Sequence, residues 1–232
     1  MGLLRFSLAV IALPFAVALV PLLRDVVRAV AVSGGGGLPV SLISAGVGFS
    51  IFLFIWTVSP KKPVRLYILG HELTHAVWGV LFGARVSNLK VSLRGGSVTL
   101  TKSNVLITLA PYFFPFYTML VVLAALVVRL FVSPLPLPAI WLFAVGFTWC
   151  FHLCFTLRAL AQHQPDVTEY GHLFSWVFIW TFNVVGLVAW LLATTEISAA
   201  FAWKSLCGNT ASAYLAVWRF AVYCWSIIPF NR

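Results

Sequence analysis

The chain has 232 residues, of which 62% are hydrophobic and 9% are Asp, Glu, Lys or Arg, against roughly 25% charged residues in ordinary globular domains. Such a composition cannot cover a water-soluble surface, so we predict an integral membrane protein. Lys and Arg outnumber Asp and Glu by 15 to 5, but no basic run is interleaved with groove-reading polar residues. Nucleic acid is therefore not an expected partner, and the cations are expected to meet anionic lipid headgroups of the bilayer.

Apolar stretches approach the roughly 20 residues that a bilayer-spanning helix needs. They cover residues 6–23, 38–58, 66–84, 104–132, 139–160, 172–194 and 211–228. We predict six spans, with the last stretch as a seventh candidate, because Arg219 and its aromatic neighbours also suit a helix lying at the interface. The first stretch has features of a signal peptide, but we expect a retained helix.

These stretches predict an all-α polytopic membrane protein of six to seven transmembrane helices. The connections are short, and no linker or repeat is evident. We therefore predict one membrane domain over residues 1–232 with a functional core at about 66–190. A bacterial-type inner membrane or an organellar membrane is the expected location.

The exception to helix is a predicted β-hairpin at about residues 86–101. Apolar and polar residues alternate on both sides of Gly95-Gly96, which suits a two-residue turn. Such a turn predicts a ladder in which apolar residues face apolar residues. The predicted pairs are Arg94 with Ser97, Leu93 with Val98, Ser92 with Thr99, and Val91 with Leu100. The alternative is a plain extramembrane loop.

The residues His71-Glu72-Leu73-Thr74-His75 lie inside the stretch 66–84. HExxH on a helix places two imidazoles one turn apart on one face, where both can bind one zinc ion. Glu72 can act as a general base toward a water molecule at the metal. The alternative is a structural His/Glu cluster, but ionisable side chains at membrane depth are costly and rarely kept without function. We predict a Zn²⁺ site with His71 and His75 as ligands and Glu72 as the catalytic residue.

A catalytic zinc ion usually has a third protein ligand. Pro165 suits the first turn of a helix, which places Asp166 and Glu169 on one face of that turn. Either carboxylate could reach the zinc ion, or both could merely favour the positive end of the helix dipole. His152 and His163 are further candidates, and Asn183 is a candidate oxyanion donor or interhelical contact.

Taken together, these motifs resemble the site-2 protease family of intramembrane zinc metalloproteases, in a compact form without a PDZ or CBS domain. The resemblance rests on HELTHA at 71–76, a Gly83-x-x-Val86 segment leading into the hairpin, and a later acidic-Gly segment before another span. It covers about residues 66–190. It implies that the third ligand is the aspartate of an Asp-Gly motif, whose strict form is absent here.

Anchoring that motif on Gly171 matches Glu169, whereas residue type and the preceding Pro165 favour Asp166. We take Asp166 as the third ligand and Glu169 as the second choice. The asparagine that the family often has in the helix after the hairpin has no counterpart at residues 109–114. The group that stabilises the substrate carbonyl is therefore unassigned.

The resemblance implies a zinc endopeptidase that cleaves peptide bonds in or near transmembrane segments of membrane protein substrates, single-span proteins foremost. An extended substrate could add to the hairpin edge as a further strand. For that role the candidate substrate-binding residues are Val91, Leu93, Val98 and Leu100.

Alternative functions are a prenyl-peptide-type membrane metalloprotease and a catalytically silent membrane adaptor or chaperone that keeps the zinc-protease fold. The first needs a glutamate as third ligand, for which only Glu169 and Glu196 are available. The second has no chemical need for Glu72. A metal transporter is less suited, because transport calls for several polar residues along a path.

Overall fold

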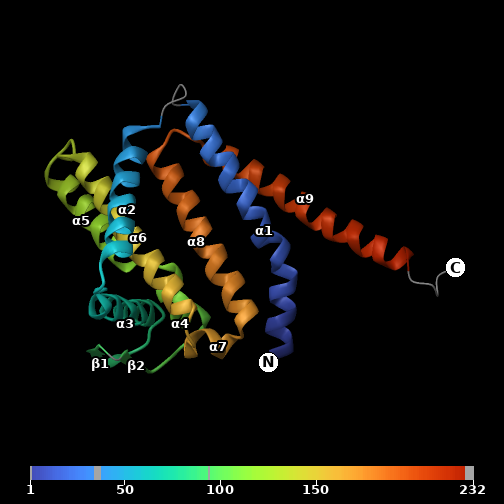
Figure 1. The fold of residues 1–232 in the computed structure, drawn as a ribbon, viewed down its shortest axis with the longest axis horizontal. Helices are drawn as coiled ribbons and strands as arrows, with labels where there is room; N and C mark the ends of the chain where they lie inside the picture. Colours follow the sequence, from blue (N-terminus) through green and yellow to red (C-terminus); the bar gives the residue numbers. More distant parts are fainter. Residues whose placement is uncertain (1, 34–37, 94, 228–232) are drawn as a thin grey trace. The chain divides into compact units, whose positions relative to one another are not determined.

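The computed structural model describes residues 2–33, 38–93 and 95–227, and these residues are mostly helical (Figure 1). The elements, in chain order, are α1 (Gly2–Ser33), α2 (Val40–Val58), α3 (Val64–Leu81), β1 (Val86–Ser92), β2 (Gly95–Leu100), α4 (Val105–Phe113), α5 (Phe116–Phe131), α6 (Pro138–Leu160), α7 (Pro165–Tyr170), α8 (His172–Thr194) and α9 (Ala199–Ser226). The predicted helical class with a single small hairpin is confirmed for the part of the chain described.

The chain divides into two compact units, which we describe separately. The first unit comprises Met1–Leu38 together with Tyr170–Arg232, and the second comprises Pro39–Glu169. The sequence predicted one domain with a functional core at 66–190. All of the residues predicted to bind metal or substrate belong to the second unit.

Four helices, namely α1, α2, α6 and α8, are long and apolar enough to cross a membrane within the described ranges. A fifth span results if α4 and α5 form one broken segment, since they pass the same test together and are bent by 80°. Pro115 explains the break, because a residue before proline is driven out of the helical region, and Phe114 is extended (φ −101°, ψ 105°). The protein is a multi-pass integral membrane protein.

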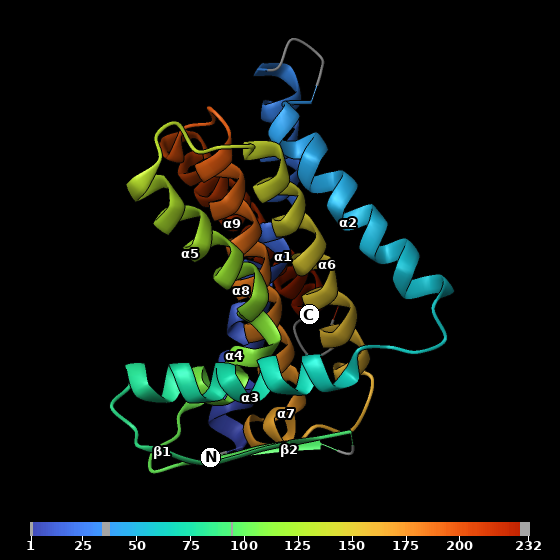
Figure 2. The ribbon, with the colours of Figure 1, turned by 90° about the vertical axis from the view of Figure 1, so that its left-hand side faces the viewer.

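Two of the predicted spans are helices that do not qualify as spans. The stretch 66–84 forms α3, whose 18 residues include Arg65 and the ionisable groups of the HExxH motif. Figure 2 shows α3 lying across the ends of α2, α5 and α6 instead of running beside them. Residues 211–226 of the last stretch form the second half of α9, where Arg219 interrupts the apolar sequence, and Lys204 and Asn209 interrupt the first half. Among the described residues, four or five spans meet the length and hydropathy criteria, beside the six to seven that were predicted.

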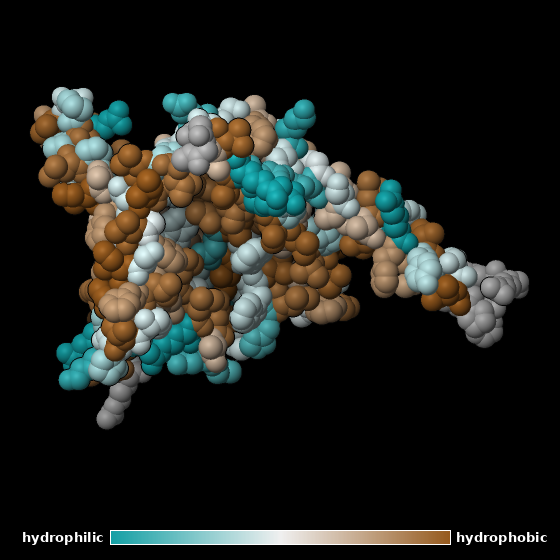
Figure 3. All heavy atoms as spheres, turned by 45° about the horizontal axis from the view of Figure 1, so that its top comes forward, coloured by the Kyte–Doolittle hydropathy of each residue, from teal (hydrophilic) through white to brown (hydrophobic). Residues whose placement is uncertain are grey.

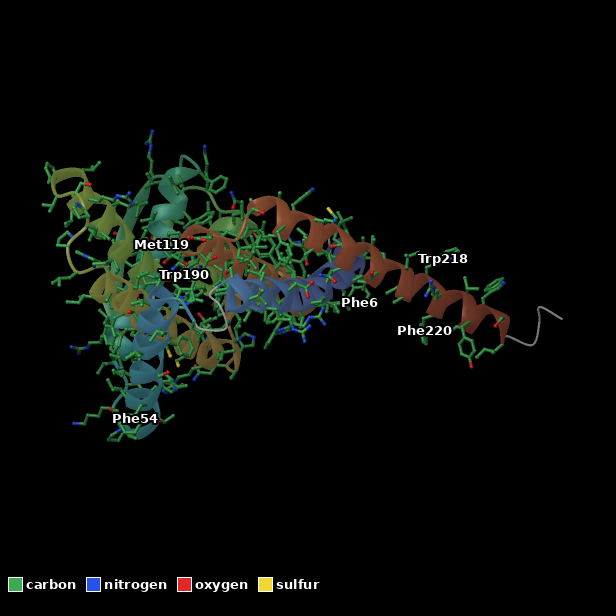
Figure 4. All side chains as sticks on the ribbon, turned by 90° about the horizontal axis from the view of Figure 1, so that it is seen from above. Phe6, Phe54, Met119, Trp190, Trp218 and Phe220 are labelled. Carbon is green, nitrogen blue, oxygen red and sulfur yellow. The ribbon has the colours of Figure 1, made fainter. Side chains whose placement is uncertain are left out.

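Apolar side chains cover the flanks of the long helices, as the hydrophobic colouring in Figure 3 shows. Phe54 of α2 and Phe220 of α9 project outward from their helices (Figure 4), with 65% and 68% of their surface exposed. A water-soluble protein rarely exposes large contiguous apolar areas. Exposed apolar surfaces of this kind are stable when the acyl chains of a lipid bilayer surround them.

In the second unit, α2 packs along α6 at very short range. A Cβ atom at Gly48 would collide with the carbonyl of Phe143, and one at Gly146 would collide with the carbonyl of Ala45. Small residues allow the backbones of membrane helices to approach in this way. Aromatic rings also pack between α6 and α3. Phe155 of α6 stacks on Tyr67 of α3, with ring centroids 4.7 Å apart. This stacking fixes α3 against the end of α6.

In the first unit, α1 packs against α8 and α9. The indole of Trp180 donates a hydrogen bond to the carbonyl of Ala16 (2.9 Å), and the hydroxyl of Tyr214 donates to the carbonyl of Ile11 (2.7 Å). Both bonds give a partner to a side-chain N–H or O–H group that lipid hydrocarbon could not hydrogen-bond.

The hairpin forms where it was predicted, but its register differs. The pairs are Val86–Leu100, Ser87–Thr99, Lys90–Ser97, Val91–Gly96 and Ser92–Gly95, with an irregularity between Ser87 and Lys90. Gly95 and Gly96 are thus ladder residues of β2, and the predicted Gly-Gly turn is wrong. Arg94, which the predicted ladder set opposite Ser97, lies outside the described residues. Asn88 has a positive φ of 52° at the irregularity, where a β-bulge-like insertion shifts the register.

Candidate metal centre

The two histidines of the HExxH motif converge from one face of α3. Their Nε2 atoms are 3.2 Å apart, because residues four apart on a helix stand one above the other. Both rings are largely buried, with side-chain exposures of 13% for His71 and 12% for His75. The helix supplies two of the donors that a metal ion needs.

The third donor comes from α7, which begins at Pro165 as predicted. Asp166, the second residue of this helix, directs Oδ2 to 3.4 Å from His71 Nε2 and 3.6 Å from His75 Nε2. Gly171, with φ of 88°, separates α7 from α8. The opening turn of a short separate helix, and not of the span itself, therefore carries the carboxylate.

The spacing of these three atoms fits a zinc ion. Zn–N and Zn–O bonds of about 2.0–2.1 Å in a tetrahedron place neighbouring ligand atoms about 3.3–3.4 Å apart. The observed separations of 3.2, 3.4 and 3.6 Å are close to that value. His71, His75 and Asp166 form the one group among the described residues in which three such donors meet.

Contacts behind the donors orient them. The ring nitrogen Nδ1 of His75 lies 2.9 Å from the carbonyl of Ile107. Because a carbonyl only accepts, Nδ1 carries a proton, and the neutral ring that binds a metal has its lone pair on Nε2. Nδ1 of His71 lies 3.4 Å from the hydroxyl of Tyr67. Outer contacts of this kind fix the tautomer of a metal-binding histidine.

Tyr112 of α4 was not among the predicted site residues. It is fully buried, and its hydroxyl donates to Asp166 Oδ2 at 3.0 Å and lies 3.3 Å from Gln164 Oε1. Its sequence position, within an apolar run, carries no signal of this contact. The contact of Tyr67 with His71 could have been predicted, because residues four apart lie on the same face of a helix.

The electrostatic setting keeps Asp166 ionised. Burial favours the neutral acid, but hydrogen bonds from His71 and His75 outweigh burial and hold the pKa of the Asp166 carboxyl below its usual range. An anionic carboxylate is the form that binds a metal ion. The site is therefore charged correctly for a divalent cation.

Glu72 stands beside this group without belonging to it. Only 7% of the residue is exposed, and its side chain lines the same cavity as the two histidines. The backbone of β2 lies directly over it: a Cβ atom at Gly96 would lie 2.6 Å from Glu72 Cγ and 2.7 Å from Oε1. Gly96 thus permits a close approach of the strand to the carboxylate, a common reason for glycine in a strand.

A cavity of about 830 Å³ surrounds the centre. Its polar lining includes Ser97, Ser103, Thr108, Arg158, Gln162 and Gln164. Of the predicted substrate-binding residues, Leu93, Val98 and Leu100 line the cavity, while Val91 pairs with Gly96 in the ladder. Glu169 also lines the cavity but is not part of the three-donor group.

The other candidates do not join the donor group. His152 is buried beside Gly70 and Tyr117, and His163 is exposed. Asn183 donates to the carbonyl of Ile179 within its own helix, which favours a structural role.

No protein-family model, curated protein or solved structure matches the chain.

Proposed function

We propose that this protein is a zinc-dependent endopeptidase of the membrane, similar in its site to the site-2 proteases, that cleaves peptide bonds in or near transmembrane segments of membrane proteins. The observation that carries the proposal is the convergence of His71, His75 and Asp166 at zinc-ligand spacing beside the Glu72 carboxylate. An integral membrane protein with this site is suited to hydrolysis at the bilayer.

The chain's own residues divide the chemistry between them. A zinc ion held by the three donors would polarise the scissile carbonyl and make bound water more acidic. Glu72 takes a proton from the attacking water and passes it to the leaving amine. Within the described residues no hydrogen bond occupies its carboxylate, so both tasks are open to it. Ile107 and Tyr112 hold His75 and Asp166 in place.

Substrate access follows from the position of the cavity in the second unit. Arg158 and Ala159 line it, and both lie in the last turn of α6, whose 23 residues span about 34 Å. A hydrocarbon core is about 30 Å thick, so the cavity lies near one end of the span. An extended segment could pair with the free edge of β2. We therefore expect cleavage near the ends of substrate spans, not at their midpoints.

Two observations weigh against the rival functions. A prenyl-peptide-type protease needs a glutamate as third ligand, whereas an aspartate meets the histidines here, and Glu196 lies outside the donor group. A silent adaptor would have no use for Glu72, which is buried at the metal group and has its carboxylate beside the cavity.

The proposal is tested by reconstituting the purified protein into liposomes that contain extracted membrane proteins. After incubation, new N-termini are labelled and identified by mass spectrometry. Protein that has been stripped of metal and returned to Zn²⁺ is expected to produce N-termini clustered near the ends of predicted spans. Stripped protein and the His75→Ala variant are expected to produce none. Identical sets of N-termini in all three samples would contradict an endopeptidase function.

Removing the Tyr112 hydroxyl is expected to weaken zinc binding. Tyr112→Phe keeps the ring but deletes the donor to Asp166, and loss of such an outer partner typically costs about 10–100-fold in metal affinity. Competition with a chromophoric chelator measures the dissociation constant.

Tyr214→Phe is the matched control, because the Tyr214 hydroxyl donates to a backbone carbonyl in the other unit. The control is expected to bind zinc as the wild type does. Equal zinc affinity in Tyr112→Phe and the wild type would show that Tyr112 does not position Asp166.

A further inference from the structure

A second cavity lies in the first unit, between the end of α1 and the beginning of α9, and the proposed hydrolysis does not use it. Its volume is about 790 Å³, within the range of small-ligand sites. The walls are largely apolar and include Ala29, Val32 and Phe201. Arg28 from α1 and Lys204 from α9 add positive charge to the lining.

The two cations are not neutralised by neighbours. Neither Arg28 nor Lys204 has a hydrogen-bond or ion-pair partner among the residues that the structure describes. The one carboxylate in the lining, Asp25, is already bound: Arg24 approaches its Oδ1 at 2.9 Å, and Ser205 and Asn209 donate to its Oδ2 at 2.8 and 3.1 Å. The cavity therefore offers a net positive charge to an incoming group.

The position along α1 indicates where this charge meets the membrane. Residues 6–23 carry no charged side chain, and about 20 residues suffice to cross the hydrocarbon core. The remainder of α1, from Arg24 to Ser33, extends about 15 Å further at 1.5 Å per residue. Arg28 thus falls at the level of the lipid headgroups, with apolar helix surface continuing toward the hydrocarbon.

We infer that this cavity binds one anionic phospholipid, with its phosphate between Arg28 and Lys204 and its acyl chains along the apolar surfaces of α1 and α9. Charge complementarity selects the headgroup, and the apolar walls favour a lipid over a free anion. Basic pockets between membrane helices bind anionic headgroups in this manner. The inference is independent of the proposed hydrolysis and would stand without it.

The test uses the full-length protein in phosphatidylcholine nanodiscs that contain increasing fractions of phosphatidylglycerol. Native mass spectrometry counts the phosphatidylglycerol molecules retained per chain. A basic residue near an anionic membrane surface contributes about fivefold in affinity. The variant Arg28→Gln/Lys204→Gln is therefore expected to bind phosphatidylglycerol about 25-fold more weakly than the wild type, and Lys204→Gln alone about fivefold more weakly.

The control pair Arg65→Gln/Arg129→Gln removes two cations of the second unit, outside this cavity, and is expected to retain lipid as the wild type does. Lys204 is exposed, so its single variant is expected to fold even if the double variant does not. Equal retention in Lys204→Gln and the wild type would overturn the inference. Equal retention of phosphatidylcholine, or displacement of the lipid by millimolar inorganic phosphate, would also overturn it.

Discussion

Asp166→Ala is expected to lower the zinc affinity of the purified protein by about 100-fold or more. Zinc sites with four ligands bind with roughly 10–16 kcal/mol, so one ligand accounts for about 3 kcal/mol, which corresponds to about a hundredfold in affinity. His75→Ala is expected to cause a loss at least as large, because it also removes the contact to Ile107. Elemental analysis after dialysis against a weak chelator measures the zinc retained.

Glu169→Ala is the matched control for this experiment. Glu169 lines the same cavity and lies three residues further along α7, but it is not part of the donor group. The control is expected to keep its zinc. If Glu169→Ala loses zinc and Asp166→Ala does not, the second-choice ligand of the sequence analysis is the correct one.

Glu72→Gln is expected to keep its zinc and to lose peptide cleavage. Glutamine has almost the same size and fits under Gly96, but it cannot accept the proton of the attacking water. General acid–base groups typically contribute 10²–10⁴-fold in rate, so cleavage of an identified substrate should fall by at least about a hundredfold. The rate is measured on reconstituted protein, and the zinc content on the same preparation.

Glu169→Gln makes the same chemical change in the same cavity and is expected to cleave at close to the wild-type rate. Normal cleavage by Glu72→Gln would exclude Glu72 as the general base. Loss of zinc in that variant would instead give Glu72 a role in holding the metal.

The metal group illustrates what local sequence spacing can predict. The four-residue separation of His71 and His75 fixed their common face, because helix geometry is independent of the rest of the fold. Pro165 located the start of α7 and hence the turn that carries Asp166. The approach of Asp166 to the histidines depends on how α7 and α3 are placed in three dimensions. The sequence therefore left Glu169 as an alternative.

The hairpin shows where pattern reasoning failed. Gly95-Gly96 matched a turn motif, and the apolar alternation supported the same register. In the structure Gly96 is required in the ladder, because β2 lies on Glu72 with no room for a side chain. A glycine needed for close packing and a glycine needed for a turn look alike in sequence, so the register was wrong.

Hydropathy alone could resolve neither the position of α3, which tertiary packing decides, nor the end of α4, which Pro115 decides. The apolar stretch 66–84 resembled a span, but its ionisable residues face a polar cavity at the end of α6. The stretch 104–132 resembled one continuous span, but it breaks before Pro115. That break leaves α4 as a short helix, from which Tyr112 reaches Asp166.

Zinc stoichiometry of the detergent-purified wild-type protein tests the central claim most directly. The account predicts one tightly bound zinc ion per chain, either as purified or after reconstitution with Zn²⁺ and removal of the excess. Absence of bound zinc under both conditions, in protein that remains folded, would contradict the metal centre and with it the proposed hydrolysis.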